Sequence, residues 1–71
     1  MNRIKDLRID HDLTQTEVAA AIGITQRKYS YIETGTQLVT EDILISLSQF
    51  YGVSVDYILR LTNVKTSYSE K

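Results

Sequence analysis

The 71-residue sequence contains neither cysteine nor proline. Without cysteine the chain can form neither a disulfide framework nor a thiolate metal site, the two devices that often stabilise small secreted domains. Its longest apolar run, residues 18–22, is far below the roughly 18 residues that suggest a membrane span, and no apolar signal core opens the chain. We therefore expect a cytoplasmic protein with no membrane partner.

An excess of positive charge is also lacking. The formal net charge is −1 and the pI is about 5.7, whereas nucleic-acid-binding domains are often strongly basic. The charges are unevenly placed, because residues 38–59 hold three acids and no base while residues 1–37 hold five of each. Any anion-binding face is therefore expected in the N-terminal half or in the C-terminal tail.

What the chain does have is the composition of an ordinary folded globule, with 42% hydrophobic and 24% charged residues. A chain of this length forms one domain with a marginal core, since about 60 residues bury only roughly 60% of their unfolded surface.

Helical spacing and capping residues predict five short helices. Apolar residues at helical spacing indicate a first helix over about residues 2–10. Thr14, followed three residues later by Glu17, has the pattern of a capping box and opens a second helix over 15–22.

A tight glycine turn separates the second helix from the third. Gly23 can adopt the left-handed conformation of a helix C-cap, and only Ile24 separates it from Thr25, the cap of a helix over 26–34. Two helices joined by so short a turn must cross steeply, as in a helix-turn-helix.

Capping residues also mark the helices in the rest of the chain. Thr40 caps a fourth helix with a strong apolar stripe, and Ser54 caps a short fifth helix. From residue 62 the sequence is polar and aperiodic, so we expect a domain over 1–61 and a flexible tail over 62–71.

The third helix presents one polar arc. At about 100° per residue, its hydrogen-bonding side chains share one side, while Tyr29 and Ile32 face inward. The arc consists of Gln26, Arg27, Ser30, Tyr31 and Thr34. No carboxylate interrupts it, and in the DNA major groove Gln can pair bidentately with adenine and Arg with guanine. We expect the first four of these residues to read bases.

These segments resemble the lambda repressor-like family of helix-turn-helix proteins, also called the Cro/CI or XRE family. The resemblance covers about residues 2–62, and its carriers are Leu13-Thr14-Gln15, Glu17-Val18-Ala19, Gly23-Ile24-Thr25-Gln26, Ile32-Glu33-Thr34-Gly35 and the stretch 51–59. It implies a compact, all-α bundle of five helices and a bacterial or prophage repressor that binds double-stranded DNA. Such a protein would be nucleoid-associated when bound.

The resemblance also assigns roles to individual residues. The glutamine that matches Gln15 holds a backbone phosphate and braces the glutamine that matches Gln26, which reads adenine. Residues matching Arg8 and Glu33 form an internal ion pair in some members, and two solvated charges are the alternative. We expect further contacts to the DNA backbone from Thr25, Lys28, Thr34, Thr36 and Gln37.

Three features depart from the family's pattern. Val39 stands where a proline is common, Glu41 replaces a usual apolar residue, and the loop with Thr36 and Gln37 lacks the usual basic residues. Phosphate contacts should therefore be few, which predicts weak nonspecific binding and a shallow dependence of DNA affinity on salt.

An enzyme is not expected. The only histidine, His11, lies between Asp10 and Asp12, but adjacent helical residues point about 100° apart and cannot easily converge on one ion. A histidine at the negative pole of the first helix is the ordinary explanation. No metal, cofactor or small-molecule ligand is evident.

A second function class stays open, namely a protein-interaction module on the same fold, such as an antitoxin or adaptor that does not bind DNA. The acidic pI favours it. A DNA reader is expected to be a homodimer on a palindromic operator, because one helix-turn-helix reads only a short half-site. Pairing through the fifth helix and tail, near Tyr57, Leu61 and Val64, is one arrangement, although exposed apolar residues at a chain end also occur without a partner.

Overall fold

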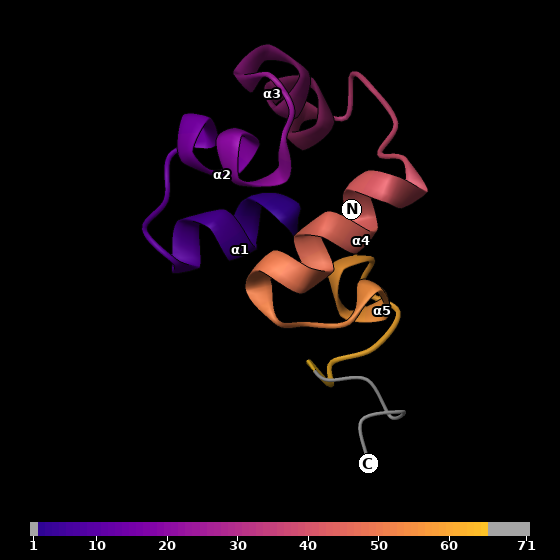
Figure 1. Cartoon of the computed structure of the whole chain (residues 1–71). Helices are drawn as coiled ribbons and strands as arrows, with labels where there is room; N and C mark the ends of the chain where they lie inside the picture. Colours follow the sequence, from indigo (N-terminus) through magenta and orange to yellow (C-terminus); the bar gives the residue numbers. More distant parts are fainter. Residues whose placement is uncertain (1, 66–71) are drawn as a thin grey trace.

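In the computed structural model, which describes residues 2–65, this part of the chain forms five α-helices and no strand. The helices are α1 (Ile4–Asp10), α2 (Gln15–Ile22), α3 (Gln26–Thr34), α4 (Glu41–Tyr51) and α5 (Val55–Ile58). In Figure 1, α2 and α3 adjoin each other, and α5 lies against α4 away from α3. The predicted all-α, five-helix architecture is confirmed, and none of these helices is long and apolar enough to cross a membrane.

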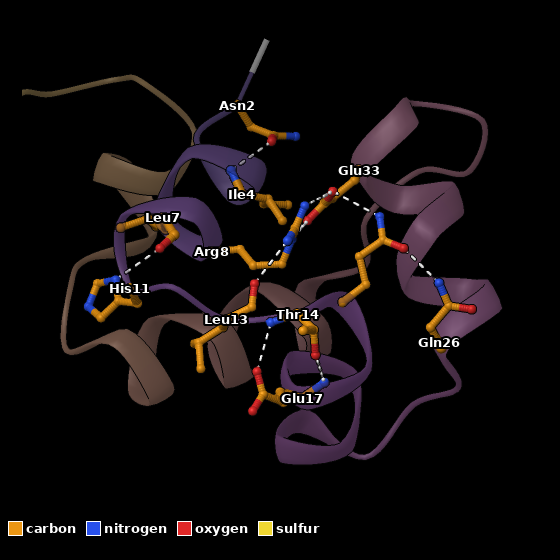
Figure 2. Close-up of polar contacts among 11 residues, drawn as sticks. Asn2, Ile4, Leu7, Arg8, His11, Leu13, Thr14, Glu17, Gln26 and Glu33 are labelled. Carbon is orange, nitrogen blue, oxygen red and sulfur yellow. Dashed lines mark hydrogen bonds and ion pairs between the residues drawn. The ribbon is translucent and has the colours of Figure 1, made fainter.

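Hydroxyl caps begin α2, α3, α4 and α5, where a threonine or serine accepts a hydrogen bond from the backbone N–H three residues later. The capping box of α2 is complete, because the Glu17 carboxylate also accepts from the Thr14 N–H at 2.8 Å. The first helix differs from the prediction and begins at Ile4. The Asn2 side-chain oxygen accepts from the Ile4 N–H at 3.0 Å, a local bond that holds residue 2 outside the helix (Figure 2).

The turn between α2 and α3 has the predicted left-handed glycine, with Gly23 at φ 78°. Its N–H donates to the Ala20 carbonyl at 3.3 Å, and the Ile24 N–H donates to the Ala19 carbonyl at 3.0 Å. Ile24 packs against the core, so the turn both ends α2 and fixes where α3 starts.

The core receives apolar side chains from all five helices. Its buried members are Ile4, Leu7, Val18, Ala19, Tyr29, Ile32, Ile43, Leu47, Val53 and Ile58. The inward direction predicted for Tyr29 and Ile32 is confirmed, since they are 0% and 3% exposed. Among the alanines of α2 only Ala19 is buried, and it lies in the core beside Val18.

Arg3 joins the start of α1 to α5. Its backbone N–H donates to the Ile58 carbonyl at 2.7 Å, and its Nε donates to the Tyr57 carbonyl at 2.8 Å. The guanidinium also lies over the Tyr57 ring, 4.2 Å from the centroid, and Nη2 donates to the Asn63 side chain at 2.8 Å. Arg3 therefore holds the two ends of the described chain together through both its backbone and its side chain.

The segment after residue 61 makes a further contact, since the Ser54 N–H donates to the Lys65 carbonyl at 2.6 Å. The division into a domain over 1–61 and a flexible tail over 62–71 stays a prediction, and residues 66–71 lie outside the described residues.

Candidate nucleic-acid interface

The outer face of α3 carries the side chains predicted to read DNA bases. Gln26, Arg27 and Tyr31 are exposed, as is Thr34 at the end of the helix, and Ser30 is half-buried. The described part of the chain thus leaves this face open to solvent. These five side chains lie on the side of α3 opposite the buried Tyr29 and Ile32, and their contacts to bases stay predictions.

The loop that follows α3 is ordered by its own hydrogen bonds. The Thr34 hydroxyl donates to the Tyr31 carbonyl at 3.2 Å and lies 3.0 Å from the Thr36 hydroxyl. The Gln37 backbone N–H donates to the same Tyr31 carbonyl at 3.1 Å. These contacts position the exposed side chains of residues 36 and 37 beside the C-terminal end of α3.

At the start of α3, Thr25 and Lys28 are joined by the helix cap. The Thr25 hydroxyl accepts from the Lys28 N–H at 3.1 Å. The Lys28 side chain is half-buried, whereas Thr25 is exposed. Their contacts to a DNA backbone stay predictions.

A series of hydrogen bonds connects the outer face of α3 to an ion pair inside the protein (Figure 2). Gln26 Nε2 donates to Gln15 Oε1 at 2.6 Å, and Gln15 Nε2 donates to Glu33 Oε1 at 3.1 Å. Arg8 donates to both Glu33 oxygens, from Nε at 2.6 Å and from Nη2 at 3.2 Å. Arg8 and Glu33 thus form an ion pair and are not two solvated charges. We call Gln26, Gln15, Glu33 and Arg8 the polar relay.

The ion pair is deeply placed, with 16% of the Arg8 side chain and 3% of the Glu33 side chain exposed. Burial alone would raise the pKa of Glu33, but hydrogen bonding, chiefly from Arg8, outweighs it and holds the pKa below its usual value. Glu33 is therefore an anion at neutral pH.

Two tyrosine hydroxyls are buried near this ion pair. Within residues 2–65 neither the Tyr29 nor the Tyr51 hydroxyl has a hydrogen-bond partner. Burial raises the pKa of both phenols, that of Tyr51 to about 12, and the Glu33 carboxylate acts in the same direction. Both phenols are accordingly neutral beside the ion pair at pH 7.

His11 occupies a structural position at the C-terminal end of α1. Its Nδ1 lies 2.9 Å from the Leu7 carbonyl oxygen, and its ring packs against Tyr51 with 5.0 Å between centroids. In the part of the chain that the structure describes, no three His, Asp or Glu side chains are grouped so that they could hold a metal ion.

Exposed apolar side chains occur at several places, among them the end of the described chain and the loop after α3. Leu61 and Val64, near the end of the described chain, are 72% and 43% exposed, while Tyr57 is half-buried beneath Arg3. Leu38, in the loop after α3, is 88% exposed, and the sequence analysis did not single it out. Leu38 and Val39 are a short apolar pair between polar residues, with no periodicity that could have marked Leu38.

The sequence analysis also missed the contact between Gln15 and Glu33. It considered Gln15 with Gln26, and Arg8 with Glu33, as two separate pairs. The structure joins them through a bond between residues 18 positions apart.

Comparisons with known proteins are consistent with this geometry. A family model described as helix-turn-helix matches residues 4–58. The chain is 36% identical over 70 residues to the cryptic phage CTXphi transcriptional repressor RstR of Vibrio cholerae. The aligned residues make up 99% of this chain and 61% of that protein. The chain is 41% identical over 61 residues to the uncharacterized HTH-type transcriptional regulator YobD of Bacillus subtilis, over 86% of this chain and 54% of the relative.

A third relative is the antitoxin PezA of Streptococcus pneumoniae, 41% identical over 51 residues, or 72% of this chain and 32% of that protein. The chain thus spans less than two thirds of the length of each of these relatives. No solved structure matches it significantly.

Proposed function

Since the chain belongs to the lambda repressor-like, or XRE, family of helix-turn-helix regulators, we propose that it binds double-stranded DNA with α3 in the major groove. The open polar face of α3 is the observation that carries this proposal. Its amide, guanidinium, hydroxyl and phenol groups can match the distinct donor and acceptor patterns of base pairs. The only acid on α3, Glu33, is turned inward and neutralised by Arg8.

In this arrangement Gln26, Arg27, Ser30 and Tyr31 read bases. The side chains around them contact the DNA backbone and set the position of α3. These backbone contacts come from Gln15, Thr25, Lys28, Thr34, Thr36 and Gln37. Gln15 suits this role because its Nε2 has a second hydrogen that is not used by Glu33.

Repression is the proposed outcome of binding, supported by the similarity to a phage transcriptional repressor. A homodimer on a palindromic operator fits the short reach of one helix-turn-helix. The exposed Leu61 and Val64 beside α5 offer an apolar surface for pairing. Sedimentation should show mass increasing with protein concentration or with operator DNA, and a constant monomer under both conditions would exclude this pairing.

Selection of bound sequences from a random DNA pool tests the main proposal, and a palindromic sequence should be enriched. Replacing Gln26 or Arg27 by Ala should then weaken specific binding by about 1–3 kcal/mol for each bidentate contact. Gln49→Ala is a matched control, because Gln49 is an exposed glutamine on α4. A pool without enrichment, or an equal effect of the Gln26 and Gln49 substitutions, would contradict the proposal.

A protein-interaction module is the second candidate, favoured by the similarity to an antitoxin and by the acidic pI of about 5.7. The double variant with Ala at positions 26 and 27 distinguishes the two functions. A DNA reader loses operator binding in this variant, whereas a module that binds a protein through another surface retains its partner.

A further inference from the structure

We propose that the buried carboxylate of Glu33, acting through Gln15, determines which edge of the Gln26 carboxamide faces DNA. Glu33 would then be a positioning residue for base specificity, although it lies in the protein interior. The inference rests on the proposed function in one respect, namely that Gln26 reads a base. The hydrogen-bond argument itself concerns only the protein.

The direction of the polar relay follows from the chemistry of its inner end. An ionised carboxylate only accepts hydrogen bonds, and Arg8 holds Glu33 in that form. The Gln15 atom 3.1 Å from Glu33 Oε1 must therefore be Nε2, which turns Gln15 Oε1 toward Gln26. Gln15 Oε1 in turn requires a donor, so the Gln26 atom that lies 2.6 Å from it is Nε2.

This order leaves Gln26 with a defined outer edge. One hydrogen of its Nε2 is used by Gln15, so the free groups are the second N–H and Oε1. One donor beside one acceptor is the complement of adenine, which presents N7 as acceptor and the N6 amino group as donor. The relay thus presents the adenine-reading edge before any DNA is bound.

Replacing Glu33 by Gln should reverse the relay. The guanidinium of Arg8 has donors only and contacts both side-chain oxygens of Glu33. The one oxygen of the new side chain would keep the shorter contact, from Nε at 2.6 Å, and the longer contact from Nη2 at 3.2 Å would be lost. The new amino group would then face Gln15 and attract its Oε1. Gln15 would offer Nε2 to Gln26, which would turn its own oxygen inward and its amino group toward DNA.

An outward amino group fits a base edge with acceptors only. Guanine presents two, N7 and O6, in the major groove. The reversed relay therefore predicts a change of preference from adenine to guanine at the base read by Gln26. A loss of packing alone would lower affinity for all sequences and would not produce this change.

Selection from a random DNA pool should be run with the wild type, Glu33→Gln and Glu17→Gln. The ratio of adenine to guanine at the affected position should fall by about 5-fold to 150-fold in Glu33→Gln, the range given by one bidentate contact. Glu17→Gln removes the same charge from a carboxylate outside the relay, so its adenine preference should equal that of the wild type. An unchanged preference in folded Glu33→Gln would overturn the proposal.

Gln15→Met provides a second test, since it removes the link while leaving the ion pair of Arg8 and Glu33 in place. Gln26 would then turn freely, and the ratio of adenine to guanine should approach one. This variant keeps the proposal open to refutation if Glu33→Gln does not fold. Adenine preference that survives in Gln15→Met contradicts the relay.

A measurement without DNA separates this inference from the proposed function. In the 15N-labelled full chain, side-chain amide hydrogens of Gln26 should exchange with water several-fold more slowly in the wild type than in Gln15→Met. The exposed Gln49 amide should show no difference. Equal exchange at Gln26 in both proteins would overturn the relay even if DNA binding is found, and slow exchange without any DNA selectivity would overturn only the base-reading role.

Discussion

The single residue Glu33 makes the stability of the fold depend on pH. Its pKa in the folded protein lies below the ordinary value of 4.5, so its ionised form stabilises the fold at every pH above that value. As the pH falls below 4.5, the unfolded chain takes up the proton first and the contribution is lost. The free energy of unfolding of the wild type should therefore exceed that of Glu33→Gln at pH 7, and the difference should shrink toward pH 3.

Urea unfolding at several pH values measures this difference, and Glu17→Gln provides the control for an exposed carboxylate. A difference that stays constant from pH 7 to 3 would show that the ion pair contributes nothing through the charge of Glu33.

At this scale the sequence indicated both pairs of the relay, through the family resemblance. It could not indicate their junction, because the bond from Gln15 to Glu33 depends on how α2 packs against α3.

At the scale of helices and turns, Gly23 determines the connection between α2 and α3. Its φ of 78° strains any side chain, and among the described residues an added Cβ would meet no atom within 4 Å. Gly23→Ala should therefore lower the free energy of unfolding by about 1–2 kcal/mol through the backbone alone. Gly52→Ala, at φ 70° before α5, should cause a similar loss.

The two variants should differ in DNA affinity, measured at a temperature where both are folded. Gly23→Ala disturbs the start of α3 and should weaken DNA binding. Gly52 lies far along the chain from α3, so Gly52→Ala should leave DNA affinity unchanged. Equal affinities would show that the turn tolerates the change. The sequence predicted the Gly23 turn and the four hydroxyl caps well, because each depends on one residue type and its neighbours. It missed the start of α1, where the Asn2 side chain competes for the Ile4 N–H.

Over the whole molecule, three of the four arginines already have partners within the protein. Arg8 pairs with Glu33, Arg60 lies 2.9 Å from Asp6, and Arg3 is held against α5. On α3 only Arg27 and Lys28 are basic. With two neutralised phosphates per protomer, log affinity against log salt concentration should have a slope of only about −2 per protomer.

Titrations between about 50 and 200 mM salt measure this slope. Thr36→Lys adds a positively charged side chain to the loop after α3 and should steepen the slope by about one unit. A wild-type slope steeper than about −5 per protomer would mean that other residues bind phosphates.

The overall fold was predictable because each helix is marked by nearby residues. The partners of Arg3 were not, since they lie 54 and more positions away.

The position of Arg3 has a consequence for how the protein opens. Its contacts join the first turn of α1 to α5, so neither end of the domain can fray without releasing the other. Backbone amides at these two distant places should thus become accessible to deuterium in one shared event. Arg3→Ala removes the side-chain contacts and keeps the backbone bond to Ile58, so it should loosen this coupling, with α5 exchanging before α1.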